Sequence, residues 1–149
     1  MKNTTNYHFS QTLFASSAPF PHFVRHGELG FTAGIIGQDR KHGQLVSDDV
    51  EQQCEAMMGN LGALQEELNL NFTHVVKTTI YLRSYEDFET INRVYGSCFA
   101  APYPVRTTLA VAALPLDAGV QIDAVLDLSH NGGTAPWVHY FPLDALVEV

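Results

Sequence analysis

Residues 104–111 read Pro-Val-Arg-Thr-Thr-Leu-Ala-Val, and this stretch predicts a β-strand that begins just after a proline. Proline fixes its own φ angle and cannot donate a backbone hydrogen bond, so it is found beside strands more often than inside them. The residues after it include several β-branched side chains, which pack well on a pleated sheet. The chain has only eight Lys and Arg residues, so a cation at the start of this strand, Arg106, needs a reason.

Two interpretations of Arg106 are open at this point. A guanidinium matches a carboxylate in shape and donates two parallel hydrogen bonds to it. The carboxylate could belong to an acidic residue of the same fold or of a neighbouring subunit, in which case Arg106 is structural. Alternatively, it could belong to a bound ligand.

The composition of the chain indicates one globular domain spanning residues 1–149, with 46% hydrophobic and 16% charged residues. Its net charge of -8 disfavours nucleic-acid binding, which needs a basic surface. No apolar run approaches the roughly 20 residues of a membrane span, and the N-terminus lacks the apolar segment of a signal peptide. Cys54 and Cys98 are isolated thiols without metal-ligand spacing, so we expect a cytoplasmic protein and no metal site at these residues.

Outward from residues 104–111, stretches with strand character alternate with stretches of helical periodicity. Gly34 and Gly37 mark a bend at which the backbone approaches another segment closely. The polar loop 38–44 follows this bend. The expected strands are an edge strand near 7–9, a hairpin of 23–26 and 29–33, and strands at 75–82, 107–111 and 120–126; the expected helices are 48–68 and 85–99.

The first helix is predicted to start at Asp48, because Glu51 lies three residues further on, at the spacing of a capping box. Gly59 and Gly62 fall inside this helix, where glycine is unfavourable by about 1 kcal/mol, so we expect close packing against a strand there. Its apolar face consists of Val50, Cys54, Met57, Leu61, Leu64 and Leu68.

This order of elements predicts an α+β fold, a mixed β-sheet with two helices on one face. The second face of the sheet carries apolar residues and has no helix to cover it, which favours a cyclic oligomer. The C-terminal tail, residues 131–149, is too apolar for a free terminus and is expected to dock on its own or a neighbouring subunit.

Several separated motifs resemble those of the reactive-intermediate deaminase family, also called Rid or YjgF. They are Pro-Val-Arg-Thr at 104–107, Leu-Pro at 114–115, Val-Gln-Ile at 120–122, and segments 75–81 and 87–95. The resemblance covers a core of about residues 20–127. It implies a chorismate-mutase-like, trimer-forming fold with clefts between subunits, and hydrolysis of enamines or imines to carbonyl compounds and ammonia without a cofactor.

The segment 20–27, Phe-Pro-His-Phe-Val-Arg-His-Gly, is most similar to the 2-aminomuconate deaminase-like branch of this family. The resemblance implies that Arg106 clamps a substrate carboxylate and that Asn92 lies in the pocket surroundings. The complete set of expected substrate-binding residues is Arg106, Phe23, Ala33, Gly34, Asn92 and Thr108.

Two positions depart from the family pattern. Gln121 stands where the deaminases have a glutamate, and Ala33 stands where many members have a serine. An amide can orient water but cannot accept its proton at neutral pH. Asp123 follows on the same strand face, displaced by about 7 Å. His22 is the expected proton shuttle, with a hydrogen-bonded loop histidine as the alternative.

Two functions therefore remain open. In the first, Arg106, Gln121 and His22 act on a small carboxylate-bearing enamine, imine or enol, either by hydrolysis or by a divergent tautomerisation or condensation. In the second, a non-catalytic trimer binds such a metabolite, or a partner protein, in the same cleft. A titratable group close to the ligand would favour the enzyme. Ribonuclease activity, suggested for some members of the family, is disfavoured by the acidic charge.

Overall fold

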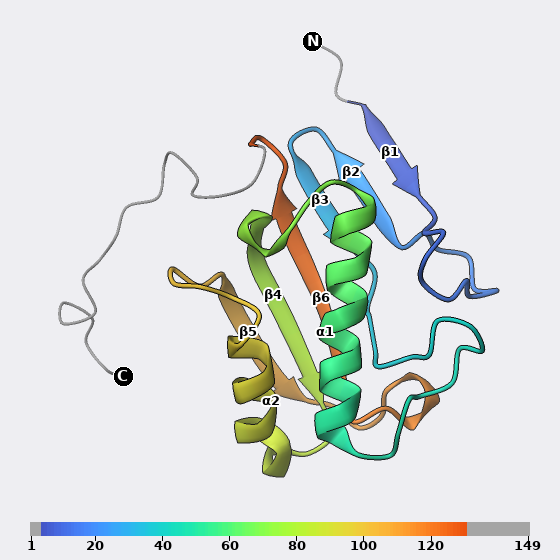
Figure 1. Cartoon of the computed structure of the whole chain (residues 1–149), viewed down its shortest axis with the longest axis vertical. Coiled ribbons are helices and arrows are strands. Elements are labelled where there is room, and N and C mark those ends of the chain that lie inside the picture. The colour runs from blue at the N-terminus through green and yellow to red at the C-terminus, as the bar shows by residue number, and fades with distance from the viewer. Residues whose placement is uncertain (1–3, 131–149) are drawn as a thin grey trace.

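The computed structural model describes residues 4–130 of the 149-residue chain, so the predicted docking tail at 131–149 lies outside the described residues. The predicted order of strands and helices is confirmed (Figure 1). The strands and helices are β1 (Thr5–His8), β2 (Phe23–His26), β3 (Leu29–Thr32), α1 (Val50–Glu67), β4 (Val75–Leu82), α2 (Phe88–Gly96), β5 (Val105–Ala110) and β6 (Val120–Asp127). Short 3₁₀ turns occupy Phe72–His74, Tyr85–Asp87 and Pro115–Asp117.

The sheet has six strands in the order β1-β2-β3-β6-β4-β5. Only β4 and β5 run parallel, and α2 forms the crossover between them, as a parallel connection requires. The last strand, β6, is inserted between β3 and β4 and pairs antiparallel with both. Both helices cover the same face of this mixed sheet (Figure 1), as predicted.

The core lies between this face and the apolar side of α1. Side chains along β6 alternate between buried and half-buried, which identifies one face of the strand as the core face. The predicted apolar face of α1 is confirmed, and Gly37 passes so close to the backbone of Gln53 that a side chain would collide there. The central buried residues are Cys54, Met57, Leu61 and Leu64 from α1 and Ile80, Leu82, Ile122 and Leu126 from the strands.

Two predicted details of the helices are wrong. The first helix begins at Val50 and its cap is Asp49, whose carboxylate accepts a hydrogen bond from the Gln52 amide, so the start predicted at Asp48 was too early. A Cβ at Gly59 would meet nothing within 4 Å, and one at Gly62 would make ordinary contact with Phe72, so neither glycine is required by packing against a strand.

The opposite face of the sheet is uncovered in the described part of the chain. Phe31, Val105 and Leu109 are 40%, 65% and 37% exposed and lie on this face, as the alternation along their strands shows. The predicted need for a cover therefore persists in the structure.

Candidate functional site

Arg106 lies on the helix-covered face of edge strand β5. It is in register with the buried Thr78 of β4, whose hydroxyl is hydrogen-bonded to the Tyr95 hydroxyl of α2. The guanidinium donates from Nη2 to Asn92 Oδ1 at 2.6 Å and from Nε to Thr108 Oγ1 at 2.8 Å. The central carbon of the guanidinium, Cζ, lies 4.7 Å from the centre of the Tyr95 ring. Three residues predicted as a set, Arg106, Asn92 and Thr108, are thus brought together.

No acidic residue in the described range 4–130 forms an ion pair with Arg106. Burial lowers the pKa of Arg106, because the charged form loses hydration, while nearby Tyr95 and Cys54 act in the opposite direction. An arginine side chain nevertheless stays protonated in proteins. Two of its five N–H donors are used, and the three that remain, on Nη1 and Nη2, include one edge of the fork that a carboxylate can bridge.

Gln121 lies on the other face of the sheet. Its neighbours in β6, Val120 and Ile122, are fully buried on the face covered by the helices. Because successive side chains of a strand point to opposite faces, the Gln121 side chain points away from the helices. Two strand spacings and three residue steps separate the register position of Arg106 from Gln121, a Cα distance of about 14 Å. One copy of the chain therefore does not place both side chains around one small molecule.

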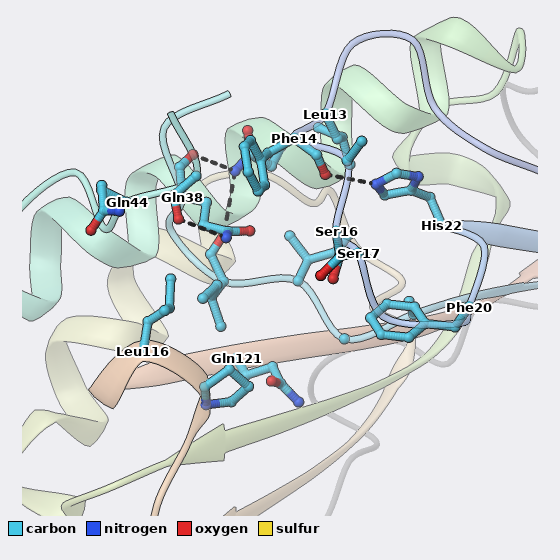
Figure 2. A pocket seen from close by; sticks show the side chains of 18 of the residues that line it. Leu13, Phe14, Ser16, Ser17, Phe20, His22, Gln38, Gln44, Leu116 and Gln121 are labelled. Carbon is cyan, nitrogen blue, oxygen red and sulfur yellow. Dashed lines mark hydrogen bonds between the residues drawn. The ribbon is translucent and has the colours of Figure 1, made fainter. Parts of the chain in front are cut away.

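Gln121 lines a cavity of about 540 Å³ (Figure 2). The predicted positions His22, Ala33 and Gly34 line the same cavity. Gly34 permits this arrangement, because a Cβ there would lie 2.7 Å from Gln121 Nε2. The Gln121 amide makes no hydrogen bond with the described part of the chain, so both its donor and its acceptor are available to a ligand.

His22 is held by both ring nitrogens. Its Nδ1 accepts a hydrogen bond from the Ser10 amide at 2.9 Å, which leaves Nε2 to carry the proton that it donates to the Phe14 carbonyl at 3.0 Å. This matches the hydrogen-bonded alternative that the sequence left open. A ring hydrogen-bonded in this way fixes the segment 10–14, of which Leu13 and Phe14 form part of one wall of the cavity.

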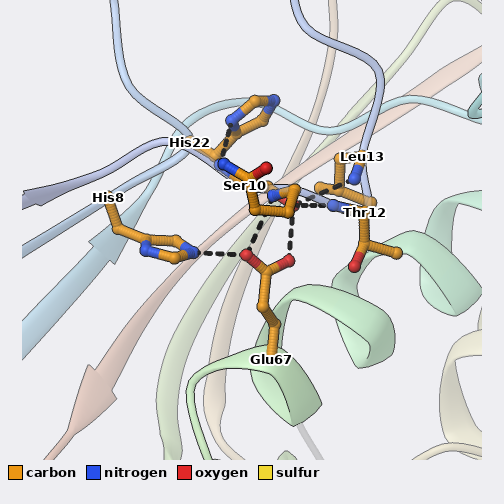
Figure 3. Close-up of polar contacts among 7 residues, drawn as sticks. His8, Ser10, Thr12, Leu13, His22 and Glu67 are labelled. Carbon is orange, nitrogen blue, oxygen red and sulfur yellow. Dashed lines mark hydrogen bonds and ion pairs between the residues drawn. The ribbon is translucent and has the colours of Figure 1, made fainter.

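Glu67 fixes the same wall from the end of α1 (Figure 3). Its carboxylate accepts hydrogen bonds from the Ser10 hydroxyl at 2.6 Å and the Gln11 amide at 3.0 Å, and His8 Nε2 lies 2.7 Å away. The Ser10 hydroxyl oxygen in turn accepts hydrogen bonds from the backbone amides of Thr12 and Leu13. Burial by itself raises the pKa of Glu67, but these hydrogen bonds outweigh it and lower the pKa to about 2.

Two other predicted positions lie away from the cavity lining. Phe23 is 4% exposed and belongs to the core, where its ring packs over Gly30. Asp123 accepts a hydrogen bond from the Tyr81 hydroxyl at 2.8 Å on the uncovered face of the sheet. This bond raises the pKa of Tyr81, because it favours the protonated phenol.

Cys54 is a fully buried core residue, and this burial raises the pKa of its thiol to about 12. Among residues 4–130, no cluster of three or more His, Cys, Asp or Glu side chains is arranged to hold a metal ion. No helix in this range is long and apolar enough to cross a membrane.

The sequence did not identify the apolar residues that line the cavity, because they lie in loops rather than in periodic segments. The one available signal was the presence of phenylalanines in a Ser/Pro-rich stretch, since loop residues are usually polar. These residues include Leu13, Phe14, Phe20, Ile36, Pro115 and Leu116.

Comparison with known proteins gives a consistent set of matches. The model of the family described as Endoribonuclease L-PSP matches residues 10–127. Reactive Intermediate Deaminase A, chloroplastic, from Arabidopsis thaliana is 37% identical over 114 residues, which cover 76% of this chain and 61% of that protein. A 2-iminobutanoate/2-iminopropanoate deaminase from Homo sapiens is 38% identical, over 64% of this chain and 69% of that protein.

The fold has close matches among solved structures. The crystal structure of E. coli TdcF with bound serine superposes with a TM-score of 0.76 at 29% sequence identity, and covers 82% of this chain and 98% of that one. The match to the Arabidopsis protein spans less than two thirds of that protein's length.

Proposed function

We propose, from the premise that this chain belongs to the Endoribonuclease L-PSP family, that it binds a small carboxylate-bearing enamine or imine and promotes its hydrolysis. The resemblance to reactive-intermediate deaminases is confirmed at the level of the family, and relatives carry deaminase names. The substrate, the reaction and the site residues are our proposal. So is the kinship with the 2-aminomuconate deaminase-like branch.

The observation that carries the proposal is the state of Arg106. Arg106 is a half-buried cation without an acidic partner among residues 4–130, and burying an unpaired charge costs free energy. Binding of an anion to the guanidinium would offset this cost. Asn92 and Thr108 hold the guanidinium in one orientation and leave a fork edge open. The presence of serine, a small carboxylate, in the TdcF structure supports a ligand of this kind.

The separation of Arg106 from Gln121 supports a site between copies of the chain. Arg106 of one copy would hold the carboxylate, and the cavity beside Gln121 of the next copy would hold the remainder of the molecule. The uncovered apolar face of the sheet provides the surface on which copies would associate. We therefore place the site in the clefts of a homotrimer.

In hydrolysis, water adds to the carbon of the C=N group and its proton passes to nitrogen. Ammonia then leaves and the carbonyl forms. Gln121 would orient the water or the imine by hydrogen bonds and would not accept the proton. His22 would position the cavity wall, because both of its nitrogens are already engaged. Asp123, which shares the strand face of Gln121 but lies outside the cavity lining, or the carboxylate of the substrate would take the proton from water and pass it to nitrogen.

The test is a binding titration together with a hydrolysis assay. We expect wild type to bind 2-oxobutanoate, the keto acid product. Arg106→Ala should weaken this binding by about 1.5–3 kcal/mol, and Arg106→Lys should also lose much of it, because lysine lacks the planar fork. Arg25→Ala is the matched control, since Arg25 donates to the Gly27 carbonyl in an exposed turn. Equal affinity of wild type and Arg106→Ala would refute the clamp.

The assay decides between the two functions. Hydrolysis of 2-iminobutanoate above the background rate indicates an enzyme of the deaminase type. Binding without any acceleration would favour the alternative, a non-catalytic trimer that binds a metabolite or a partner in the same cleft. The observation that favours the non-catalytic alternative is that no carboxylate occurs among the described residues that line the cavity.

A further inference from the structure

The cavity beside Gln121 is larger than a three- or four-carbon imino acid requires. A cavity of about 150 Å³ is sufficient to hold benzene, whereas this cavity measures about 540 Å³. That volume lies within the range of about 300–1,000 Å³ found for pockets that hold drug-sized ligands. A molecule the size of 2-iminobutanoate or 2-iminopropanoate, the compounds in the name of the human relative, would leave most of this space unfilled.

The walls of the cavity suit hydrocarbon. Leu13, Phe14 and Phe20 come from one loop, and Leu116 comes from the opposite side (Figure 2). The described residues that line the cavity include no Asp, Glu, Lys or Arg, and the titratable ones are His22, whose two ring nitrogens are already engaged, and His42. Its side chain is 70% exposed and its Nδ1 lies 3.0 Å from the Asp39 carboxylate, so it stands at the solvent side.

Most of the polar side chains in the lining are already satisfied by the chain itself. Gln38 donates to the Gly43 carbonyl, and Asn60 donates to two backbone carbonyls and accepts from Arg40. Both nitrogens of His22 are used as well. The lining side chains without a hydrogen bond in the described part of the chain are Ser17, Gln44 and Gln121, so polar partners for a ligand are confined to these positions. Burying a polar group against the apolar walls would be unfavourable.

Leu116 supplies an independent observation. Its φ of 56° and ψ of 22° are left-handed, a conformation that residues other than glycine adopt rarely. Its side chain is 52% exposed although it is apolar, and it lines the cavity. Strained residues of this kind cluster at ligand sites, where the surroundings hold them in place.

We propose that this cavity receives an uncharged aromatic side chain, so that the preferred substrates are imines or enamines of aromatic 2-amino acids. This inference rests on the proposed function and specifies its substrate class. The carboxylate would meet Arg106 of a neighbouring copy, the C=N group would lie at the Gln121 amide, and the ring would fill the space between Phe20 and Leu116.

The first test compares keto acids that differ only in their side chain. We expect phenylpyruvate to bind at least tenfold more tightly than pyruvate, the factor that burial of a ring makes available. The imine of phenylalanine, generated in situ by an amino-acid oxidase, should likewise be hydrolysed with a higher kcat/KM than the imine of alanine. Equal affinity, or a preference for pyruvate, overturns the inference and leaves the proposed function standing.

The second test locates the ring. Leu116→Ala and Phe20→Ala should each weaken phenylpyruvate binding about fivefold or more and change pyruvate binding less than twofold. Both side chains are about half exposed, so the variants should fold. Tyr7→Ala, at an exposed aromatic residue outside the cavity, is the control and should change neither. If phenylpyruvate is preferred but all three variants bind it like wild type, the ring binds elsewhere and the inference is wrong. If no keto acid binds and no imine is hydrolysed, the proposed function itself fails.

Discussion

At the scale of single residues, the chain holds a fixed cation and a free amide in different places. Arg106 is oriented by neutral partners, Asn92 and Thr108, and Gln121 is placed by the absence of a side chain at Gly34. The guanidinium can fix an anion, and the amide can offer the two N–H donors of its NH₂ group and its carbonyl oxygen as acceptor. Neither group can take a proton from water at neutral pH, so the rate of any hydrolysis depends on a base from elsewhere.

This reasoning makes a prediction for Gln121→Glu. Wild type should hydrolyse 2-iminobutanoate slowly, and the variant should be faster by about tenfold or more, because an ionised carboxylate can accept a proton from water. The measurement is the rate of imine loss in competition with semicarbazide at neutral pH.

Gln44→Glu is the control for this change, because Gln44 is another amide in the lining of the same cavity without a hydrogen bond in the described part of the chain. It should leave the rate unchanged. A fast wild-type enzyme that Gln121→Glu does not improve would show that Asp123 or the substrate carboxylate already supplies the base.

At the scale of elements, the cavity depends on a contact between the end of α1 and the segment that follows β1. Glu67 is the last residue of α1, where the negative end of the helix dipole disfavours a carboxylate. The hydrogen bonds from Ser10, Gln11 and His8 outweigh that cost and tie segment 8–13 to the helix. Hydrogen bonds to α1 therefore position one wall of the cavity, although α1 contains none of the predicted catalytic or substrate-binding residues.

Glu67→Gln should lower the free energy of unfolding by about 1.5–3 kcal/mol at pH 7, the range for hydrogen bonds to a charged group. The folded pKa of Glu67 is about 2 and its ordinary value is 4.5. Because the pKa of Glu67 is lower in the folded state, its carboxylate contributes fully to stability at pH values above 4.5. This contribution is lost as the pH falls from 4.5 toward 2. The difference between wild type and variant should shrink over the same interval.

The measurement is chemical denaturation at a series of pH values. Glu66→Gln is the matched control, because the exposed Glu66 makes no side-chain hydrogen bond in the described part of the chain, and it should have little effect. Hydrogen exchange at the amides of Thr12 and Leu13, which donate to the Ser10 oxygen, should become faster only in Glu67→Gln. A loss of stability that does not change with pH would contradict the role of the charge.

At the scale of the whole molecule, a six-stranded sheet has helices on one face and exposed apolar residues on the other. Monomeric proteins rarely expose such a surface. We predict that the protein is a homotrimer in solution. Light scattering at micromolar concentration should report the mass of three chains, and the mass of one chain would refute the architecture.

A mixing experiment tests whether the site lies between copies. Arg106→Ala and Gln121→Ala chains should each bind phenylpyruvate weakly. In a mixed cyclic trimer, one cleft combines an intact Arg106 from one chain with an intact Gln121 from the next, so refolding the two variants together should restore part of the binding. A site contained within one chain would gain nothing from mixing.

The sequence by itself determined the elements and their order. Alternation along residues 120–126 and the 3–4 spacing of apolar residues in α1 follow from local backbone geometry, so both patterns were readable and are confirmed. The close approaches at Gly34 and Gly37 were also predicted correctly. Boundaries were less certain, because Asp48 and Asp49 are chemically equivalent as caps and only the backbone decides between them.

Only the tertiary structure decided what these residues can do together. The insertion of β6 between β3 and β4, with the register of β4 and β5, sets the separation of Gln121 from Arg106, which no periodicity reveals because strand order and register are non-local properties. The same folding brings the loop after β1, the bend at Gly34 and the turn at Leu116 around one cavity. The sequence offered His22 either as a proton shuttle or as a hydrogen-bonded loop histidine. Only the fold shows partners for both of its ring nitrogens, because these hydrogen bonds join separate segments that meet after the chain has folded.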